Sequence, residues 1–220
     1  MASMDVAAEM EDKYPNLQVL KYRALAPLLL KIRDKNTTHV QFKLYADRLM
    51  SILAEEGLAS CASTTVTVET PTGDLFTGVA PAENVCAVSI IRAGDSLLHA
   101  VISCDQTVAV GKILIQRDES SADKHPVMYY SKLPPKIEMF ENVVVVDPML
   151  GTGGSVKMAI KVSAGLWALS VNVAGFNQSV HVKVVTTGVD RGLNEDKYLV
   201  PGIGDYGDRY FNTVHNPHHP

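Results

Sequence analysis

Asp147 and the residues after it form the densest group suited to ligand chemistry in this sequence. Four valines (143–146) precede the acid, and three glycines and two hydroxyl residues lie within residues 151–155. A buried strand that runs into a glycine-rich helix start presents free N–H groups and the positive end of the helix dipole, which favours a phosphate. The carboxylate of Asp147 suits a pair of sugar hydroxyls instead. The segment predicts a sugar-phosphate site; the alternative is an ordinary strand–turn–helix with glycines for tightness.

Arg92 and Arg117 each follow an apolar run of the kind that forms a buried strand. A guanidinium at the end of such a strand is costly unless it meets an anion. Two of them can clamp a pyrophosphate. The alternative for each is an internal ion pair.

Residues 198–208 contain three glycines and one proline. This composition predicts a tight loop with exposed backbone N–H and C=O groups. Such groups can recognise the edge of a planar base without a charged side chain. A glycine-rich turn without a ligand is the alternative.

The elements that position these residues are predicted from apolar runs. Four runs predict strands of a parallel sheet buried on both faces: residues 85–91, 112–116, 143–146 and 182–186. Residues 96–103 and 155–164 predict helices, and the alternation predicts an α/β doubly wound sheet. Polar residues 120–132 predict an excursion between two strands, either a mobile lid or a plain β-hairpin.

The N-terminal part predicts a helical arm. Helical spacing of apolar residues predicts one helix over 17–32 with a break at Pro27, and a second that starts after Thr37 or Thr38 and stops at Gly57. Residues 64–69 predict a strand, with a turn at 71–74. We expect flexible ends at 1–16 and 215–220. Residues 17–214 then form a single domain that includes the arm, over about 17–60.

Composition argues against several classes of function. The 220 residues carry a formal net charge of −4, whereas a general nucleic-acid binder normally has a basic surplus. No apolar stretch is long enough to span a membrane, and the first residues do not resemble a secretory signal. Three cysteines without a CxxC pair imply no disulfide framework, so we expect a reducing compartment, the cytoplasm. The P-loop pattern is absent, and the dinucleotide-binding pattern finds no support.

These pieces, in this order, resemble the uracil phosphoribosyltransferases, which are type I phosphoribosyltransferases. Residues 147–155 resemble their phosphoribosyl-pyrophosphate loop, and the resemblance extends to IRAG at 91–94, QRDE at 116–119 and PGIGD at 201–205. Residues 32–37 resemble the N-terminal arm of the family, and the match runs from about Leu17 to Thr213. The implied fold is a mostly parallel central sheet flanked by helices, with an N-terminal helical arm and a small hood over the base site.

The resemblance implies a reaction in which uracil and 5-phosphoribosyl 1-pyrophosphate (PRPP) give UMP and pyrophosphate. It implies Mg²⁺ bound through pyrophosphate and water, with no direct protein ligand. Catalytic roles are implied for Asp147, Arg92, Arg117 and Asp205. Asp147, Arg92 and Arg117 are also implied contacts of PRPP. The other implied phosphate and pyrophosphate contacts are Leu150, Gly151, Thr152, Gly153, Gly154, Ser155, Ala93 and Gly94. The implied uracil contacts are Tyr198, Leu199, Gly202, Ile203, Gly204 and Asp205, with Leu199 and Gly204 acting through backbone atoms.

Two departures from the family pattern leave alternatives open. Gly151 stands where many relatives have alanine, and residues 170–184 are roughly ten residues short of the pattern. One alternative function is therefore a catalytically weak or silent homologue that binds UMP or PRPP as a regulator. Another is transfer to a different base, such as a purine or orotate, for which Arg209 is the obvious cation near the base loop.

The resemblance also implies partners other than the substrates. A homodimer or homotetramer is expected, and neither nucleic acid nor membrane is. Some relatives respond to GTP, and Arg33 and Lys35 can join such an effector site. The alternative for these residues is an ion-paired subunit interface.

Overall fold

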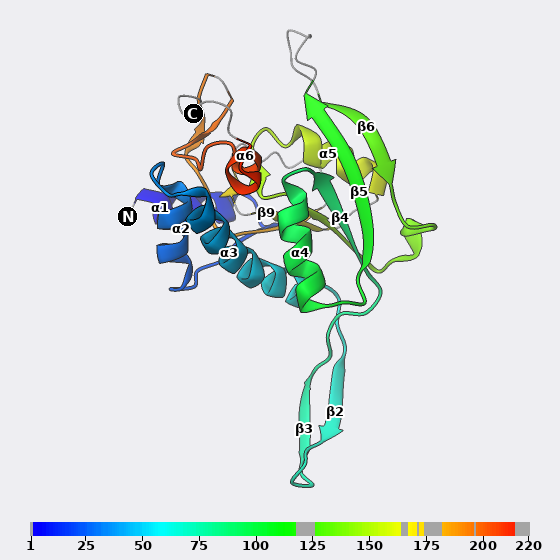
Figure 1. The fold of residues 1–220 in the computed structure, drawn as a ribbon. Helices are drawn as coiled ribbons and strands as arrows, with labels where there is room; N and C mark the ends of the chain where they lie inside the picture. The colour runs from blue at the N-terminus through cyan, green and yellow to red at the C-terminus, as the bar shows by residue number, and fades with distance from the viewer. Residues whose placement is uncertain are drawn as a thin grey trace.

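A seven-stranded sheet lies at the centre of the protein (Figure 1). The computed structural model describes residues 2–117, 126–163, 167–170, 172–173, 182–195 and 197–213. The strand order is β1-β11-β9-β7-β4-β5-β6, and every neighbouring pair is parallel except β5 and β6. The strands are β1 (Leu17–Val19), β4 (Val85–Ile91), β5 (Ala109–Arg117), β6 (Pro126–Lys132), β7 (Asn142–Val146), β9 (Trp167–Ser170) and β11 (Lys183–Thr186). The predicted α/β fold with a mostly parallel sheet is confirmed.

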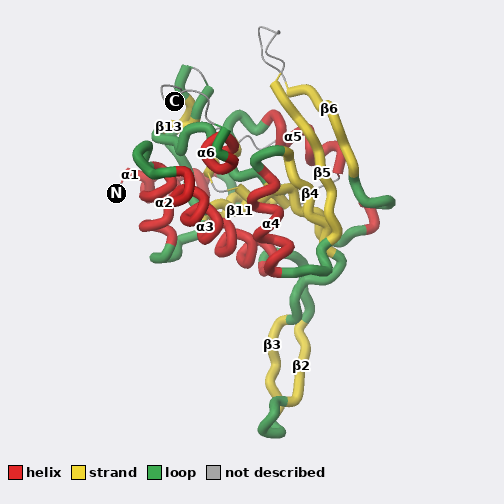
Figure 2. The backbone as a smooth tube through the Cα atoms, viewed as in Figure 1, coloured by secondary structure: helices red, strands yellow, loops and turns green. Residues whose placement is uncertain are grey.

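Helices cover both faces of this sheet (Figure 2). One face packs against α2 (Leu25–Arg33), α3 (His39–Ala59), α4 (Gly94–Cys104) and α6 (Tyr206–Phe211), and the other against α1 (Ala2–Lys13) and α5 (Gly154–Ser163). The valines of β7 alternate between the two cores: Val144 and Val146 join the first, and Val143 and Val145 the second. Burial on both faces explains why these strands appear in the sequence as continuous apolar runs.

The chain reverses its winding direction between β4 and β7. From β4 it passes through α4 to β5 on one side, whereas from β7 it passes through α5 to β9 on the other. The two strands are neighbours, with Ser89 beside Val146. Loops that leave adjacent strands in opposite directions open a crevice at the carboxyl ends of those strands, where ligands of such sheets bind.

The N-terminal segment departs from the sequence prediction. Residues 2–13, expected to be flexible, form α1, whose Ala7 is buried against the second core. The Glu11 carboxylate accepts a hydrogen bond from Val19 N–H at 2.9 Å. The apolar stripe of this helix is narrow and interrupted by acids, which is why composition suggested a flexible end.

The predicted helix over 17–32 is also wrong in its first part. Residues 17–19 form β1, which adds to the sheet beside β11 with Leu17 and Val19 buried. A three-residue strand is too short to show a period in the sequence. Helix α2 starts only at Leu25 and holds Pro27 in its first turn, where the missing N–H costs no intrahelical bond.

Helix α3 confirms the predicted start and corrects the predicted end. Thr38 is the N-cap, with its side chain accepting from Gln41 N–H. The helix continues through Gly57 to Ala59. Gly57 is buried within the last turn, so it is a helix residue rather than a C-cap.

A long hairpin projects from the body of the protein. Strands β2 (Thr65–Glu69) and β3 (Leu75–Val79) are antiparallel, which confirms the predicted strand and turn. The hairpin precedes β4 and points away from the carboxyl ends of the parallel strands (Figure 1).

Short elements complete the described fold. They are the 3₁₀ turn Ile137–Met139, the ribbon of β8 (Met149–Leu150) with β10 (Asn172–Val173), and the ribbon of β12 (Gly192–Leu193) with β13 (Leu199–Val200). Strand β6 pairs with β5, so the hairpin alternative holds for residues 126–132; residues 118–125 lie outside the described part of the chain. Within that part, no helix has the length and apolarity needed to cross a membrane.

Candidate functional site

The turn from β7 into α5 is the phosphate turn predicted from the sequence. Strand β7 ends at Val146, and α5 starts at Gly154. The hydroxyl of Thr152 accepts from Gly154 N–H at 3.4 Å, and Gly153 has a φ of 76°, which favours glycine. Thr152 is exposed and Ser155 half-buried. The hydroxyls, the free N–H groups and the positive dipole end of α5 therefore gather at one edge of the sheet, as an anion site requires.

Asp147 lies at the start of this turn in a half-buried position. Burial raises the pKa of Asp147 from its ordinary value of 3.8 to about 7, against the hydrogen bond from Met149 N–H, which lowers it. The carboxyl group is thus poised to ionise near neutral pH. Hydroxyl donors or a nearby cation would favour the carboxylate.

The turn from β4 into α4 lies directly beside the phosphate turn. A Cβ at Gly94 would come within 2.5 Å of Val146 O and 2.9 Å of Ser89 Oγ, so only glycine fits between the two strand ends. The peptide bond between Ile91 and Arg92 is cis. The sequence-predicted residues Ala93 and Gly94 are therefore brought against the end of β7, next to Asp147.

Asp95 holds the start of α4 in place. Its Oδ1 accepts from Ser89 Oγ at 2.7 Å, and its Oδ2 pairs with Lys112 Nζ at 2.8 Å. The three residues come from β4, α4 and β5. Neither Asp95 nor Lys112 was singled out in the sequence, because neither stands at the end of an apolar run.

The two predicted arginines have different outcomes. Arg92 forms an ion pair with Asp208, Nη2 to Oδ1 at 2.6 Å, and donates to Thr213 Oγ1 at 3.1 Å. The internal ion pair weighed for Arg92 is therefore present, at a partly exposed position at the mouth of the crevice. The backbone of Arg117 ends β5, and its side chain lies outside what the structure describes.

The predicted base loop follows the β12–β13 ribbon. Leu199 begins β13, the Val200–Pro201 bond is cis, and both Gly202 and Gly204 have positive φ. Asp205 is the N-cap of α6, accepting from Asp208 N–H at 2.9 Å. Tyr198 is half-buried, and its N–H donates to Asn194 Oδ1.

The elements on either side of the base loop, α6 and β12, lie against the two strand-end turns. A Cβ on Gly207 would lie 3.5 Å from Arg92 Nη2 and 3.8 Å from Ala93 Cβ. A Cβ on Gly151 would lie 3.8 Å from Leu193 Cδ2 in β12. The three predicted segments therefore lie together at the carboxyl ends of β4 and β7, where the sheet topology predicts a ligand-binding crevice.

Comparison with known proteins identifies the family that shares these features. The family model of uracil phosphoribosyltransferase matches residues 19–213. The chain belongs to the uracil phosphoribosyltransferase family.

Relatives in this family align over nearly the whole chain. Uracil phosphoribosyltransferase from Saccharomyces cerevisiae is 42% identical over 193 residues, covering 82% of this chain and 88% of that protein. The Dictyostelium discoideum enzyme is 39% identical over 215 residues, covering 91% and 98%. A solved structure of a protein from Aquifex aeolicus superposes with a TM-score of 0.75 at 25% identity, covering 91% of this chain and all of that one.

The departure from the family pattern at Gly151 has a simple structural account. The nearest atom to a Cβ at this position is at ordinary van der Waals distance, and its φ lies outside the positive range. Alanine would fit here, so glycine is tolerated rather than required. The second departure falls on residues 170–184, of which 171 and 174–181 lie outside the described residues.

Arg209, weighed as a cation for orotate, is committed to the protein backbone. Its guanidinium donates to Ile32 O, Ile203 O and Asp34 O at 2.6–2.8 Å and lies over the Phe42 ring. A group held by three carbonyls is not free to pair with a carboxylate on the base.

Arg33, weighed for an effector site, is also engaged within the chain. It pairs with Asp190, Nη2 to Oδ1 at 2.9 Å. This is an ion pair inside one subunit, so it is neither a free cation nor the interface pair considered from the sequence. Sequence reasoning missed Asp190 and Asp208 as support for the site. Both lie within the stretch from Leu17 to Thr213 that resembles the family, which was the available signal.

Proposed function

We propose that the protein transfers the 5-phosphoribosyl group from PRPP to uracil, giving UMP and pyrophosphate. The observation that carries this proposal is that two half-sites lie side by side at the carboxyl ends of β4 and β7. The phosphate turn and the β4–α4 turn form one half, and the loop 198–205 forms the other. The elements on either side of that loop meet the first half, β12 beside Gly151 and α6 beside Arg92 and Ala93. Membership of the uracil phosphoribosyltransferase family supports the same reaction.

The phosphate turn binds the sugar phosphate. The backbone N–H groups and hydroxyls of Gly151, Thr152, Gly153, Gly154 and Ser155 hold the 5′-phosphate, with buried Leu150 supporting the turn. Asp147 accepts hydrogen bonds from the two ribose hydroxyls once it is ionised.

The β4–α4 turn and the arginines receive the pyrophosphate. Ala93 and Gly94 offer backbone N–H groups at the start of α4, and the backbone of Arg117 ends β5 at the same edge of the sheet. Arg92 exchanges Asp208 for the pyrophosphate. The exchange is inexpensive because a partly exposed ion pair contributes little.

The loop 198–205 recognises uracil. Leu199 and Gly204 contact the base through backbone atoms, Tyr198 lines the site, and Gly202 and Ile203 set the turn. Asp205 is exposed at the N-cap of α6. It would lie near the ribose and near the water molecules that surround Mg²⁺. Fixed backbone donors and acceptors discriminate between bases because a mismatched edge leaves a polar group unpaired.

No covalent nucleophile is needed for this transfer. As the bond between ribose and pyrophosphate breaks, positive charge grows on the sugar and negative charge on the leaving group. The arginines stabilise the leaving group. The two half-sites hold uracil and sugar in the geometry for attack, which removes much of the entropic barrier.

The carboxylates of the predicted site fit Mg²⁺ that is bound through pyrophosphate and water. Among the described residues, no group of three His, Cys, Asp or Glu side chains could hold a metal by itself. Asp147 and Asp205 are two of the carboxylates in the predicted site segments, and pyrophosphate oxygens with water suit the preference of Mg²⁺. When bound, Mg²⁺ neutralises charge on the pyrophosphate.

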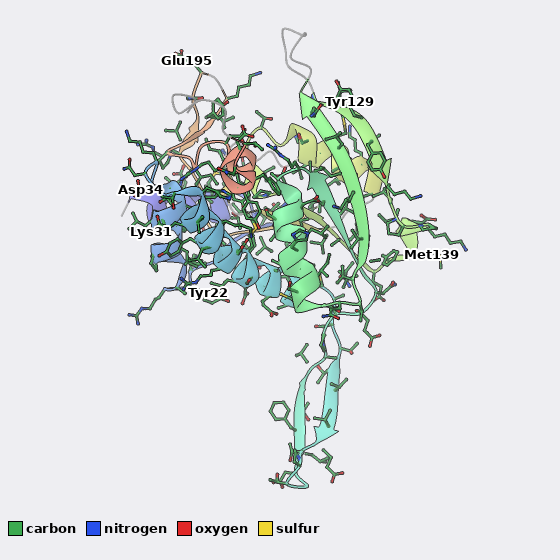
Figure 3. All side chains as sticks on the ribbon, viewed as in Figure 1. Tyr22, Lys31, Asp34, Tyr129, Met139 and Glu195 are labelled. Carbon is green, nitrogen blue, oxygen red and sulfur yellow. The ribbon has the colours of Figure 1, made fainter. Side chains whose placement is uncertain are left out.

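The β2–β3 hairpin supports a homo-oligomer. The side chains of the hairpin extend away from the body of the protein (Figure 3). Its exposed apolar residues include Val68 (53%), Phe76 (61%) and Val79 (70%). A two-stranded hairpin is marginal in water by itself, and exposed apolar patches mark interaction sites. We assign this hairpin to contact with a second copy. A Phe76→Ser, Val79→Ser variant that sediments like the wild-type protein would remove that assignment.

The sequence also raised the location of the protein and a GTP effector, and only the location is part of this proposal. The three cysteines are free, which supports a cytoplasmic location that microscopy of a tagged protein can test. A GTP effector is not part of the proposal, because Arg33 is committed to Asp190.

A panel of bases with PRPP and Mg²⁺, followed by pyrophosphate release, tests the reaction. We expect turnover with uracil and none with orotate or hypoxanthine. An Asp147→Asn variant run beside it is expected to lose about 100-fold in kcat/KM for PRPP. Binding of UMP to the folded protein without any turnover would identify the silent homologue instead.

A further inference from the structure

Gly202 is held on both sides by one buried ion pair. Its N–H donates to Asp190 Oδ2 at 3.0 Å, and its C=O accepts from Arg33 Nη1 at 2.9 Å. Arg33 Nη2 and Asp190 Oδ1 close the cycle at 2.9 Å. The guanidinium, the carboxylate and the backbone of a single residue therefore form a ring of three partners.

This ring is buried and leaves Gly202 little freedom. The Asp190 side chain is 2% exposed and that of Arg33 is 23% exposed. Gly202 has a φ of 71°, and a Cβ there would lie 2.2 Å from Leu199 O. Because its N–H and C=O are both bound to charged groups, rotation about either backbone bond of Gly202 would break a charge-assisted hydrogen bond.

Arg209 ties the same two segments together from the opposite direction. It lies on α6 and donates to Ile203 O, next to Gly202, and to Ile32 O and Asp34 O on either side of Arg33. Carbonyls at the end of a helix lack intrahelical partners, and here a cation satisfies them. Two guanidinium groups therefore join the end of α2 to the base loop, that of Arg33 from α2 and that of Arg209 from α6.

We propose that Arg33 and Asp190 are positioning residues for base recognition. They fix the conformation of the Leu199–Gly204 backbone, which recognises uracil. The end of α2 is thereby part of the base half of the site, although it touches no substrate. This inference rests on the proposed function of the loop as the uracil site.

The test is Arg33→Lys, with kcat and both KM values measured at saturating second substrate. Lysine can still pair with Asp190 but cannot also donate to Gly202 O in the same geometry. We expect the KM for uracil to rise about tenfold, equivalent to one charged hydrogen bond. The KM for PRPP and kcat are expected to stay within about twofold, since uniform binding of one substrate is what is lost.

Lys31→Met is the matched control. Lys31 lies on the same helix, two residues earlier, and its side chain extends into solvent (Figure 3). The substitution removes a cation from the same turn of α2 and leaves the ring of Arg33, Asp190 and Gly202 intact. Both KM values should remain those of the wild-type protein.

A second variant covers the case in which Arg33→Lys does not fold. Asp190→Asn keeps the shape of the side chain and removes its charge, and the same selective rise in the uracil KM is expected. Combining it with Arg33→Lys should cost less than the sum of the two, because both act through one ring.

The outcomes separate this inference from the proposed function. Turnover of uracil by the wild-type protein supports the function, whatever the variants do. An unchanged uracil KM in both variants, or an equal rise in both KM values, overturns the positioning role and leaves the function standing. Absence of turnover in the wild-type protein overturns the function itself. The inference then fails with it, because the loop would have no uracil to read.

Discussion

The phosphate half and the base half of the site are held together in different ways. In the phosphate half, the β4–α4 and β7–α5 turns, the ligand-facing groups belong to junctions between one strand and the next helix. In the base half, residues 190–195 and 197–209, the regular elements are two strands of two residues and the short helix α6. Its conformation depends on bonds such as Arg209 to Ile32 O, between residues 177 apart.

The difference predicts two kinds of sensitivity. The phosphate half is packed at strand ends, so added volume should damage it most. The base half is also tightly packed at Gly202, but it is braced in addition by charged hydrogen bonds, so loss of a donor or an acceptor should damage it as well. A variant that affects the wrong substrate would break this comparison.

Gly94→Ala should have the largest effect. The new Cβ would lie 2.5 Å from Val146 O, a backbone atom that cannot move without displacing β7. We expect a loss of about 100-fold in kcat/KM for PRPP and of about 1–3 kcal/mol in the free energy of unfolding. Steady-state kinetics and urea unfolding measure the two quantities.

Gly192→Ala is the control for that variant, because a Cβ there has nothing within 4 Å. It should retain wild-type kinetics. If Gly94→Ala kept its kcat/KM for PRPP, dense packing would not be what positions the phosphate half.

The next largest effect should be a difference in pH dependence between kcat/KM for PRPP and kcat/KM for uracil. Asp147, with a pKa raised to about 7 by burial, must ionise to accept the ribose hydroxyls. We expect kcat/KM for PRPP to fall about tenfold per pH unit below 7. The profile of kcat/KM for uracil at saturating PRPP should stay flat there, since Asp147 is then already ionised.

The same shift affects stability with a definite sign. The folded protein binds a proton at Asp147 more tightly than the unfolded chain does, so this contribution is present below about pH 4 and is lost as pH rises to about 7. Asp147→Asn should remove both the kinetic limb and this stability change. If kcat/KM for PRPP still fell below pH 7 in Asp147→Asn, that fall would belong to another titrating group.

Asp208→Asn should have a smaller effect, at the point where the halves touch. In the proposed binding mode Arg92 leaves Asp208 to reach the pyrophosphate, and the side chains of the pair are 47% and 39% exposed. Removing the competing charge should lower the KM for PRPP by up to about fivefold, which is the range of a surface ion pair. Initial-rate kinetics at low salt measure it. A raised KM would mean that Asp208 instead aims Arg92 at the ligand.

Gly151→Ala should have the smallest effect and the opposite sign. The position has room for a Cβ and needs no positive φ. We expect a gain of about 0.4–1 kcal/mol in the free energy of unfolding from reduced freedom of the unfolded chain, with kinetics within about twofold. Denaturant unfolding measures the gain. A large loss of activity would show that the turn needs glycine after all.

Most of the phosphate half could be predicted from short stretches of sequence. The apolar runs that became β4 and β7, and the glycines and hydroxyls after Asp147, carry their meaning within about ten residues. Segments without such a local signal were misread. The strand β1 is three residues long, and α1 has a stripe interrupted by acids. Whether such elements form depends on their tertiary contacts and not on a hydrophobic period in the sequence.

The sequence by itself determined the order of the ligand-binding segments and the chemistry each can perform. The tertiary structure alone decided which charged groups meet. Arg92 pairs with a residue 116 positions away, and Arg33 bonds Gly202 across 169 positions. The physical reason is distance along the chain. A turn forms its hydrogen bonds from the conformations of a few neighbouring residues, whereas a guanidinium finds its carbonyl only after the sheet has brought α2 and α6 together.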